Sequence, residues 1–214
     1  WQYNYHLKKQ ITLEGCMKSS KNNRIMVIQE AIKDAHNYAI EHCGLPLNKM
    51  PEYFLGVAIG QKMVSAFDNF NVRFEMSVQQ LMEHAGIQLS GDKANRENGR
   101  FDLVLLTKRG ETPAHIIEIK RGVKIDSMLS DIKRLANICR YVQAGTRLET
   151  NYFVTVTARS HELVLKRIEI LEQKSIDNRG LENITINTPI LVELGEFNDK
   201  PIVAAIYEIT YRYD

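Results

Sequence analysis

The chain lacks the residue patterns that identify several common classes of protein. Its three cysteines, Cys16, Cys43 and Cys139, form no CxxC motif or Cys/His cluster, so no zinc or disulfide framework is indicated. It has no Gly-rich phosphate-binding loop, HExxH motif or nucleophile elbow, so nucleotide hydrolysis, zinc peptidase and serine hydrolase activities have no starting residues. No apolar run approaches the roughly 20 residues of a membrane span, and no signal-peptide pattern opens the chain. These absences favour a cytoplasmic protein with reduced core cysteines and no membrane partner.

An excess of charge of either sign is also lacking. The formal net charge is +2, so the composition as a whole does not require a nucleic acid partner. The stretch 108–134 differs, because it holds seven basic residues against four acidic ones. Such a basic stretch would suit a polyanionic substrate. A solvated loop and helix face explains any single one of these residues equally well.

The composition suits a single domain over 1–214 with a full-sized core, because 44% of the residues are apolar. Apolar residues at intervals of three and four predict helices over 23–43, 51–67, 77–84, 126–143 and 160–173. Runs of β-branched and aromatic residues predict strands over 72–76, 103–106, 115–119 and 152–157, with two or three more between 184 and 213. The N-terminal stretch is expected to form a short strand over 3–7 or an arm packed on the body. The resulting fold class is α/β, a mixed sheet flanked by helices, with its core at about 51–173, an N-terminal helical extension over 1–50 and a C-terminal β extension over 184–214.

Two side-chain environments follow from these helices. The broad buried face expected for the helix that begins near Pro51 consists of Tyr53, Phe54, Val57, Ala58, Met63, Val64 and Phe67. His36, in the first helix, has no carboxylate or cysteine partner at ligand spacing, so we expect it on the helix surface. A polar loop over 89–99 leads from the third helix to the next strand.

A β-hairpin between Asn98 and Lys124 places charged residues in an apolar background. Its two short strands flank a turn-rich segment over 108–113. Paired positions in an antiparallel hairpin add up to a constant, so folding back about Gly110 places Asp102 opposite Glu118. Lys120 lies two residues after Glu118 and therefore projects from the same face of the strand. The hairpin thus predicts a cluster of two carboxylates and an ammonium.

This cluster has the chemistry of a divalent metal site. Mg²⁺ binds oxygen ligands and commonly takes one or two protein carboxylates. A neighbouring lysine can hold a metal-activated water or offset negative charge in a transition state. The alternative is a solvated strand edge at Glu118 and Lys120, with Asp102 capping a turn. Ile116, Ile117 and Ile119 favour the metal site, because they indicate a strand buried on both faces, where unpaired charges are costly.

The arrangement of Asp102 followed by Glu118-Ile119-Lys120 across a hairpin resembles the PD-(D/E)xK nuclease superfamily, the restriction-endonuclease-like fold. Phe101 stands where the family name places proline. The resemblance implies that Asp102 and Glu118 bind Mg²⁺, which Mn²⁺ could replace, and that the backbone carbonyl of Ile119 supplies a third oxygen. It also implies that Lys120 positions the attacking water.

The order of predicted elements extends the resemblance to about 51–173. Helix, strand, strand, strand, helix, strand is the order from 51 to 157, which matches the αβββαβ core of that superfamily. Members often add a glutamate from the helix before the sheet, and this implies a role for Glu52, although a helix start favours a carboxylate through the macrodipole alone. Glu75, on the first core strand, is the less favoured candidate acid.

The resemblance predicts a metal-dependent deoxyribonuclease, most simply an endonuclease of restriction, repair or defence type, with DNA as its partner. The Gln-x-x-x-Tyr signature of the RecB-like branch is absent, which leaves exonuclease against endonuclease open. Cleavage of both strands would favour a homodimer. An inactive nuclease-like fold that binds nucleic acid or serves in assembly is one alternative, and an unrelated α/β binding protein is another. The residues expected to contact DNA phosphates are Arg100, Arg121, Lys124, Lys133 and Arg134.

Overall fold

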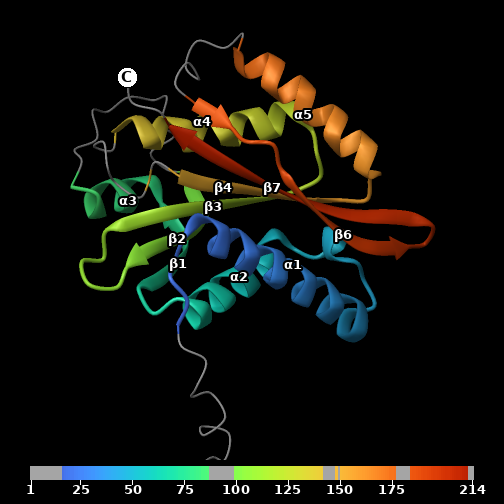
Figure 1. The fold of residues 1–214 in the computed structure, drawn as a ribbon, viewed down its shortest axis with the longest axis horizontal. Helices are drawn as coiled ribbons and strands as arrows, with labels where there is room; N and C mark the ends of the chain where they lie inside the picture. Colours follow the sequence, from blue (N-terminus) through green and yellow to red (C-terminus); the bar gives the residue numbers. More distant parts are fainter. Residues whose placement is uncertain (1–15, 87–98, 142–147, 149, 177–183, 212–214) are drawn as a thin grey trace, which may run out of the picture.

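The computed structural model describes residues 16–86, 99–141, 148, 150–176 and 184–211 (Figure 1). The strand predicted over 3–7 and most of the polar loop predicted over 89–99 lie outside these residues. The described residues form a mixed sheet of seven strands flanked by five α-helices. The α/β class and the mixed sheet are therefore confirmed.

The elements agree with the predicted ones to within a few residues. The α-helices are α1 (Lys21–Cys43), α2 (Glu52–Ala66), α3 (Val78–His84), α4 (Ile125–Tyr141) and α5 (His161–Ile176), and a 3₁₀ turn covers Leu47–Lys49. The strands are β1 (Phe70–Ser77), β2 (Arg100–Thr107), β3 (Pro113–Arg121), β4 (Thr150–Thr157), β5 (Ile184–Ile186), β6 (Ile190–Phe197) and β7 (Lys200–Tyr211). None of the helices in the described segments is both long and apolar enough to cross a membrane.

The strand order of the sheet is β1-β2-β3-β4-β7-β5, and β6 pairs with β7. The β3–β4 pair is parallel, and the other pairs are antiparallel. This follows from the connections, because α4 carries the chain back across the sheet between β3 and β4, as a parallel pair requires. The C-terminal strands extend the sheet through β7, which pairs with β4.

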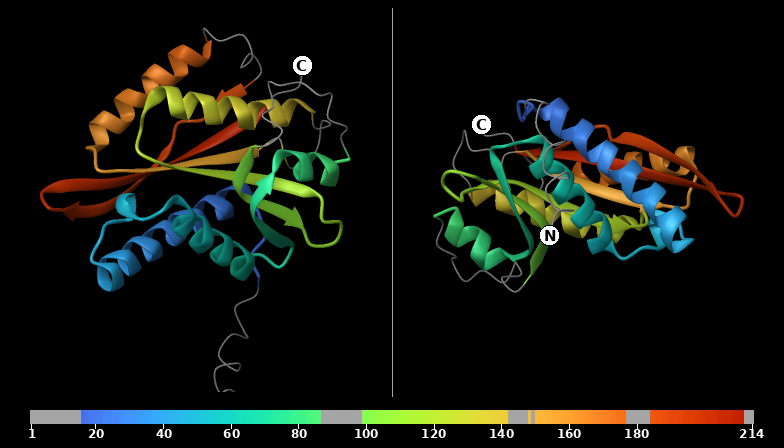
Figure 2. Two further views of the ribbon diagram at one scale, coloured as in Figure 1. Left: turned by 180° about the vertical axis from the view of Figure 1, so that it is seen from behind. Right: turned by 90° about the horizontal axis from the view of Figure 1, so that it is seen from below.

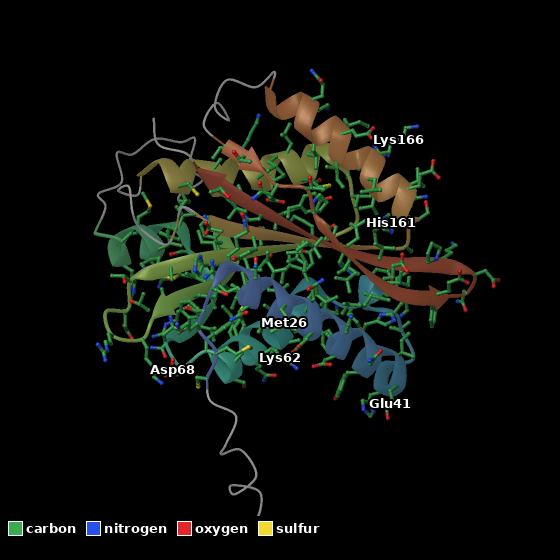
Figure 3. The ribbon with its side chains drawn as sticks, in the orientation of Figure 1. Met26, Glu41, Lys62, Asp68, His161 and Lys166 are labelled. Atoms are coloured by element: carbon green, nitrogen blue, oxygen red, sulfur yellow. The ribbon has the colours of Figure 1, made fainter. Side chains whose placement is uncertain are left out.

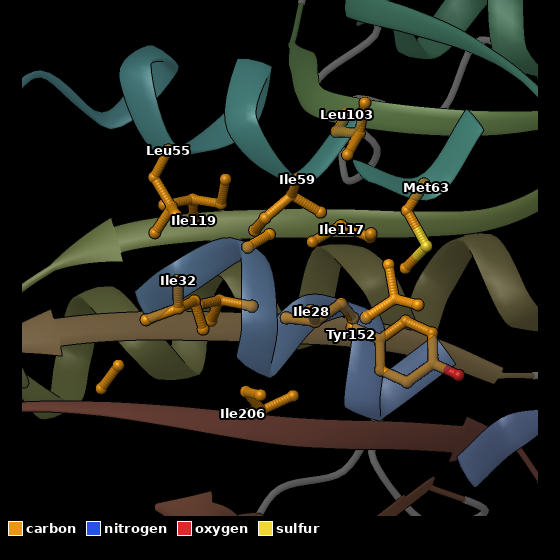
Figure 4. Packing of buried hydrophobic residues seen from close by; sticks show 14 of the residues in the cluster. Ile28, Ile32, Leu55, Ile59, Met63, Leu103, Ile117, Ile119, Tyr152 and Ile206 are labelled. Atoms are coloured by element: carbon orange, nitrogen blue, oxygen red, sulfur yellow. The ribbon is translucent and has the colours of Figure 1, made fainter. Parts of the chain in front are cut away.

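Helices cover both faces of the sheet in two layers. Helices α1 and α2 pack on one face, and α3, α4 and α5 pack on the other (Figures 1 and 2). Alternation along β3 divides its side chains, because Ile117 and Ile119 contact the α1/α2 layer while Ile116 contacts the opposite layer. Figure 4 shows Ile28 and Ile59, from α1 and α2, packed beside Ile117. The hairpin is therefore buried on both faces, as predicted.

The buried face of α2 matches the predicted one only in part, because Met63 and Phe67 are buried as predicted. Leu55, Ile59 and Met63, at intervals of four, face the sheet and are buried, whereas the side chain of Tyr53 is 66% exposed. Val57 and Val64 are exposed as well. The reason is geometric, because a helix lying flat on a sheet buries one narrow stripe and its remaining apolar residues stay in contact with solvent.

His36 and two of the cysteines also lie in unexpected places. His36 is buried, with 6% of its surface exposed, because the Leu47–Lys49 turn folds back against α1. The Leu47 N–H donates to His36 Nδ1 at 3.4 Å. Burial lowers the pKa of His36 below its ordinary value. Cys16 and Cys43 are exposed, so the prediction of core cysteines is correct for Cys139 alone.

Candidate active site

The register of the hairpin brings the two predicted carboxylates together. The β2–β3 pairs include Leu103 with Ile117 and Val104 with Ile116, which is the predicted register. The paired residues end at Leu103 and Ile117. Continuing this register by one residue places Asp102 of β2 opposite Glu118 of β3, and Asp102 Oδ2 accepts a hydrogen bond from the next residue of β3, Ile119. A bulge between Leu105 and Leu106 shifts the pairing only toward the turn, so the open end of the hairpin keeps its register.

Asp102 is half-buried and bound to the neighbouring strand. Its Oδ2 accepts a hydrogen bond from the Ile119 N–H at 2.7 Å. Burial raises the pKa of Asp102 to about 6, although the Ile119 N–H and the charge of Lys120 act in the opposite direction. The carboxylates of Glu52 and Glu75 add to the increase. An unusual concentration of negative charge therefore surrounds Asp102.

Glu118 is the most buried acid of the site, with 2% of its surface exposed. Its Oε1 accepts a hydrogen bond from the guanidinium of Arg134, whereas its Oε2 is buried and has no hydrogen-bond partner in the described part of the chain. Burial and the charge of Asp102 raise the pKa of Glu118 to about 8, against the opposing charge of Arg134. The charges of Arg134 and Lys120 thus offset only part of the burial of Glu118 and of its repulsion by Asp102.

Lys120 projects toward the acids that surround the end of the hairpin. Its Nζ lies 3.5 Å from Asp131 Oδ2 and 3.9 Å from Glu52 Oε2. Burial alone would lower the pKa of Lys120, but Asp131, Glu52, Glu118 and Asp102 together raise it. Lys120 therefore stays protonated at neutral pH. It can donate hydrogen bonds and offset negative charge, but it cannot accept a proton.

The two candidate additional acids approach the site from different elements. Glu52, in the first turn of α2, accepts a hydrogen bond on Oε1 from the Arg121 N–H at 2.9 Å, and so joins the start of α2 to the end of β3. Glu75 lies in register opposite Asp102, but the β1–β2 pairs pass from Phe74–Leu103 to Met76–Phe101 and omit it. Its backbone has a φ of 51°, a strained value for glutamate. The structure brings both glutamates close to Asp102.

Helix α4 adds two charged side chains to the site. Asp131 is buried, and its Oδ1 lies 3.6 Å from Arg134 Nη2. The guanidinium of Arg134 also lies over the ring of Phe101, 4.9 Å from the centroid, in a cation–π arrangement. The sequence predicts Arg134 as a phosphate contact, whereas in the structure it binds Glu118 and Asp131. Asp131 was missed, although its i,i+3 spacing to Arg134 on the apolar face of the helix is a usable signal.

The other predicted phosphate contacts are spread around this end of the sheet. Arg100 is exposed at the start of β2, and Lys133 is half-buried on α4. Arg121 and Lys124 are exposed and line the same pocket, just beyond the end of β3. The structure therefore brings together two of the five predicted contacts.

The arrangement of oxygens permits a two-carboxylate metal site. Among the described residues, no group of three or more His, Cys, Asp or Glu side chains is placed to hold a metal. Asp102 and the unpartnered Oε2 of Glu118 offer carboxylate oxygens, and the Ile119 carbonyl lies on the same edge of β3 as its N–H, which points to Asp102. Two carboxylates and one carbonyl suit a hard divalent cation that retains several waters. The donor set fits Mg²⁺ or Mn²⁺.

Fold and site together define a mixed α/β protein with a partly buried cluster of carboxylates, lysine and arginine at the open end of a β-hairpin. A comparison of the chain with models of protein families, with curated proteins and with solved structures finds no match.

Proposed function

We propose that this protein is a metal-dependent nuclease that hydrolyses phosphodiester bonds of DNA, and that it acts as an endonuclease. The observation that carries the proposal is the closeness of Asp102 to Glu118 and Lys120 at the open end of a buried hairpin. The element order α2, β1, β2, β3, α4, β4, with α3 inserted after β1, supports a restriction-endonuclease-like core. Neither observation alone would suffice, because one fold supports many activities.

Each side chain of the cluster has a role in this proposal. Asp102, Glu118 and the carbonyl of Ile119 would hold the metal, which would polarise a phosphate oxygen and lower the pKa of a bound water. Lys120, protonated and hydrogen-bond donating, would orient the attacking water and stabilise negative charge on the phosphate. Arg134 holds Glu118 in a fixed orientation from α4. Glu52 keeps Lys120 beside the carboxylates.

The test is cleavage of supercoiled plasmid with Mg²⁺, with Mn²⁺ or with EDTA. We expect nicking by the wild type with either metal and none with EDTA. Asp102→Asn, Glu118→Gln and Lys120→Met should each reduce the rate by about two orders of magnitude or more, the usual effect of removing a residue that stabilises a transition state. Glu41→Gln, at the exposed end of α1 far from the site, is the matched control (Figure 3). Cleavage that persists in all three site variants would contradict the proposal.

A second candidate function has its own support. The pairing of Arg134 with Glu118 occupies one carboxylate oxygen with a protein cation, which favours a nuclease-like fold that binds nucleic acid without cutting it. Binding of DNA without cleavage at stoichiometric protein, with either metal, would select this alternative.

For the active enzyme, cleavage of both strands would favour a homodimer, which sedimentation of the protein on a DNA duplex would detect.

A further inference from the structure

A positively charged pocket lies immediately beyond the candidate active site. Its volume is about 660 Å³. It is formed where β3 and β4 end, between the turn that leads into α4 and the side of α5. The residues that line it are Arg121, Gly122, Val123, Lys124, Ile125, Asp126, Thr157, Arg159, Arg167, Ile170 and Lys174. Three separate segments of the chain therefore contribute to one hollow.

The charge of this pocket is far from balanced. Five cationic side chains line it, and Asp126 is the one acid among its lining residues. Asp126 pairs with Lys174, with 3.3 Å between Oδ1 and Nζ. Arg121, Arg159 and Arg167, like Lys124, have no acidic partner within ion-pair distance in the described part of the chain. Four cations that converge without acids repel one another, so the pocket favours a bound anion.

The start of α4 adds to this preference. Ile125 and Asp126, in the first turn of this 17-residue helix, line the pocket. The first N–H groups of a helix have no partner within the helix, and the helix dipole is positive at that end. The backbone at the start of α4 and the cationic side chains thus both present positive charge to the pocket, which suits phosphate oxygens.

The pocket and the candidate active site share a residue. Arg121 donates its backbone N–H to Glu52 and also lines the pocket, and it directly follows Lys120 in β3. We infer that the pocket binds the terminal phosphate of a nucleic acid strand at a nick or a free end, so that a phosphodiester close to that end lies at Asp102 and Glu118. This inference rests on the proposed function, because it takes the carboxylate cluster as the place of cleavage.

A terminal phosphate suits the pocket better than an internal one. A phosphomonoester carries close to two negative charges at neutral pH and offers three acceptor oxygens, whereas a phosphodiester carries one charge. Arginine binds such a group through paired hydrogen bonds, and two arginines of the pocket come from outside the hairpin. Internal phosphates of a continuous strand would require basic residues along an open groove, whereas here five cations gather in one hollow.

The test measures binding without cleavage. One fluorescently labelled single-stranded DNA is prepared with a 5′-phosphate, with a 3′-phosphate or with hydroxyls at both ends, and fluorescence anisotropy is recorded with wild-type protein in EDTA. We expect one of the phosphorylated strands to bind about tenfold more tightly than the hydroxyl strand, the scale of a gained charge-assisted contact. Inorganic phosphate should compete and reduce this difference.

Variants identify the pocket as the origin of the preference. The double substitution Arg159→Ala and Arg167→Ala should reduce the preference to about twofold or less, with the affinity for the hydroxyl strand changed much less. Lys166→Ala is the matched control, because Lys166 is an exposed charge on α5, next to Arg167 but outside the pocket (Figure 3). This variant should retain the preference. Circular dichroism of the double variant establishes that it is folded.

Each contrary result overturns the inference. The wild type would bind all three strands equally, or the double variant would keep the preference for the phosphorylated strand. A third contrary result is that the double variant binds all three strands more weakly by the same factor, which would assign the pocket to general binding of the DNA backbone. The plasmid cleavage test of the proposed function does not depend on this inference, because a covalently closed plasmid has no strand end for the pocket to bind. An end preference without plasmid cleavage would retain the pocket and reject the endonuclease, and cleavage without an end preference would do the reverse.

Discussion

Arg134 is the residue that keeps the buried carboxylate of Glu118 compatible with folding. Its guanidinium hydrogen-bonds to Glu118, lies 3.6 Å from Asp131 and stacks on the ring of Phe101. An ionised carboxylate buried to this extent is costly unless a cation and hydrogen bonds compensate for the lost hydration. Arg134 therefore stabilises the metal-free site, and a bound metal would share Glu118 with it.

Arg134→Ala should lower the free energy of unfolding by about 3–5 kcal/mol in EDTA, because it leaves Glu118 buried without its cation. Urea denaturation measures this change. Lys62→Ala, which removes an exposed ion pair with Asp34, is the control and should lose no more than about 1 kcal/mol. Losses of equal size in the two variants would show that the Arg134 pair has no special role.

The protonation of His36 should make the stability of the protein depend on pH. Burial lowers its pKa, so the unfolded chain binds a proton at a higher pH than the folded protein does. The stability that depends on neutral His36 is therefore present above its ordinary pKa of 6.5 and is lost as the pH falls toward the lowered folded value. Protonation at Nδ1 would also break the bond from the Leu47 N–H.

His36→Gln should thus flatten the decrease in stability between about pH 6.5 and pH 5, the range below the ordinary histidine pKa. The measurement is the free energy of unfolding by urea across this range. His42→Gln, on the exposed surface of the same helix, should follow the wild-type curve. Parallel curves for His36→Gln and the wild type would contradict the prediction.

At the scale of elements, α2 is the helix that sets the position of the open end of the hairpin. It packs on β3 through Leu55 and Ile59, and its first turn holds the end of that strand through Glu52. Two glycines, Gly56 and Gly60, are buried on this helix. Because the space around the two glycines differs, substituting each by alanine tests how closely α2 packs on the sheet.

Gly56→Ala should raise the melting temperature, because a Cβ there would lie at an ordinary 3.5 Å from Ile119 Cδ1 and alanine favours the helix by roughly 0.5–1 kcal/mol. Gly60→Ala should lower it. A Cβ at Gly60 would lie 2.7 Å from Phe74 Cζ and 3.2 Å from Leu103 Cδ1, so the Phe74 ring or the helix must shift. Differential scanning fluorimetry separates the two variants, and a similar gain in both would show that the contact with Phe74 relaxes freely.

At the scale of the whole molecule, the site lies where both helical layers reach one end of the sheet. Glu52 comes from the α1/α2 layer, Asp131 and Arg134 come from the opposite layer, and the hairpin lies between them. The cluster and the basic pocket both lie toward the carboxyl ends of the parallel strands β3 and β4, where open α/β sheets commonly bind ligands. Metal binding at this position should stabilise the entire fold.

Mn²⁺ should raise the melting temperature of the wild type, and EDTA should reverse the effect. A ligand at about 100 times its Kd stabilises the folded state by about 2.7 kcal/mol. Asp102→Asn and Glu118→Gln should remove this response, whereas Glu41→Gln should keep it. Thermal unfolding of the four proteins with and without Mn²⁺ measures it, and an equal response in all of them would contradict a metal site at these carboxylates.

What the sequence determined by itself is local. Turn residues and alternating apolar residues predicted the hairpin and its register, and hence Asp102 beside Glu118, because antiparallel pairing across a short turn leaves few alternatives. The succession of helices and strands was readable for the same reason, since each element carries its own periodicity.

Only the tertiary structure decided how separate elements meet. Which face of α2 is buried, why His36 is enclosed and how Arg134 comes to bind Glu118 all depend on contacts between segments far apart in the chain. Arg159 and Arg167 join the basic pocket without any local signal, because each comes from a different element than the hairpin. Periodicity identifies an amphipathic face, but the packing of whole layers determines what that face contacts.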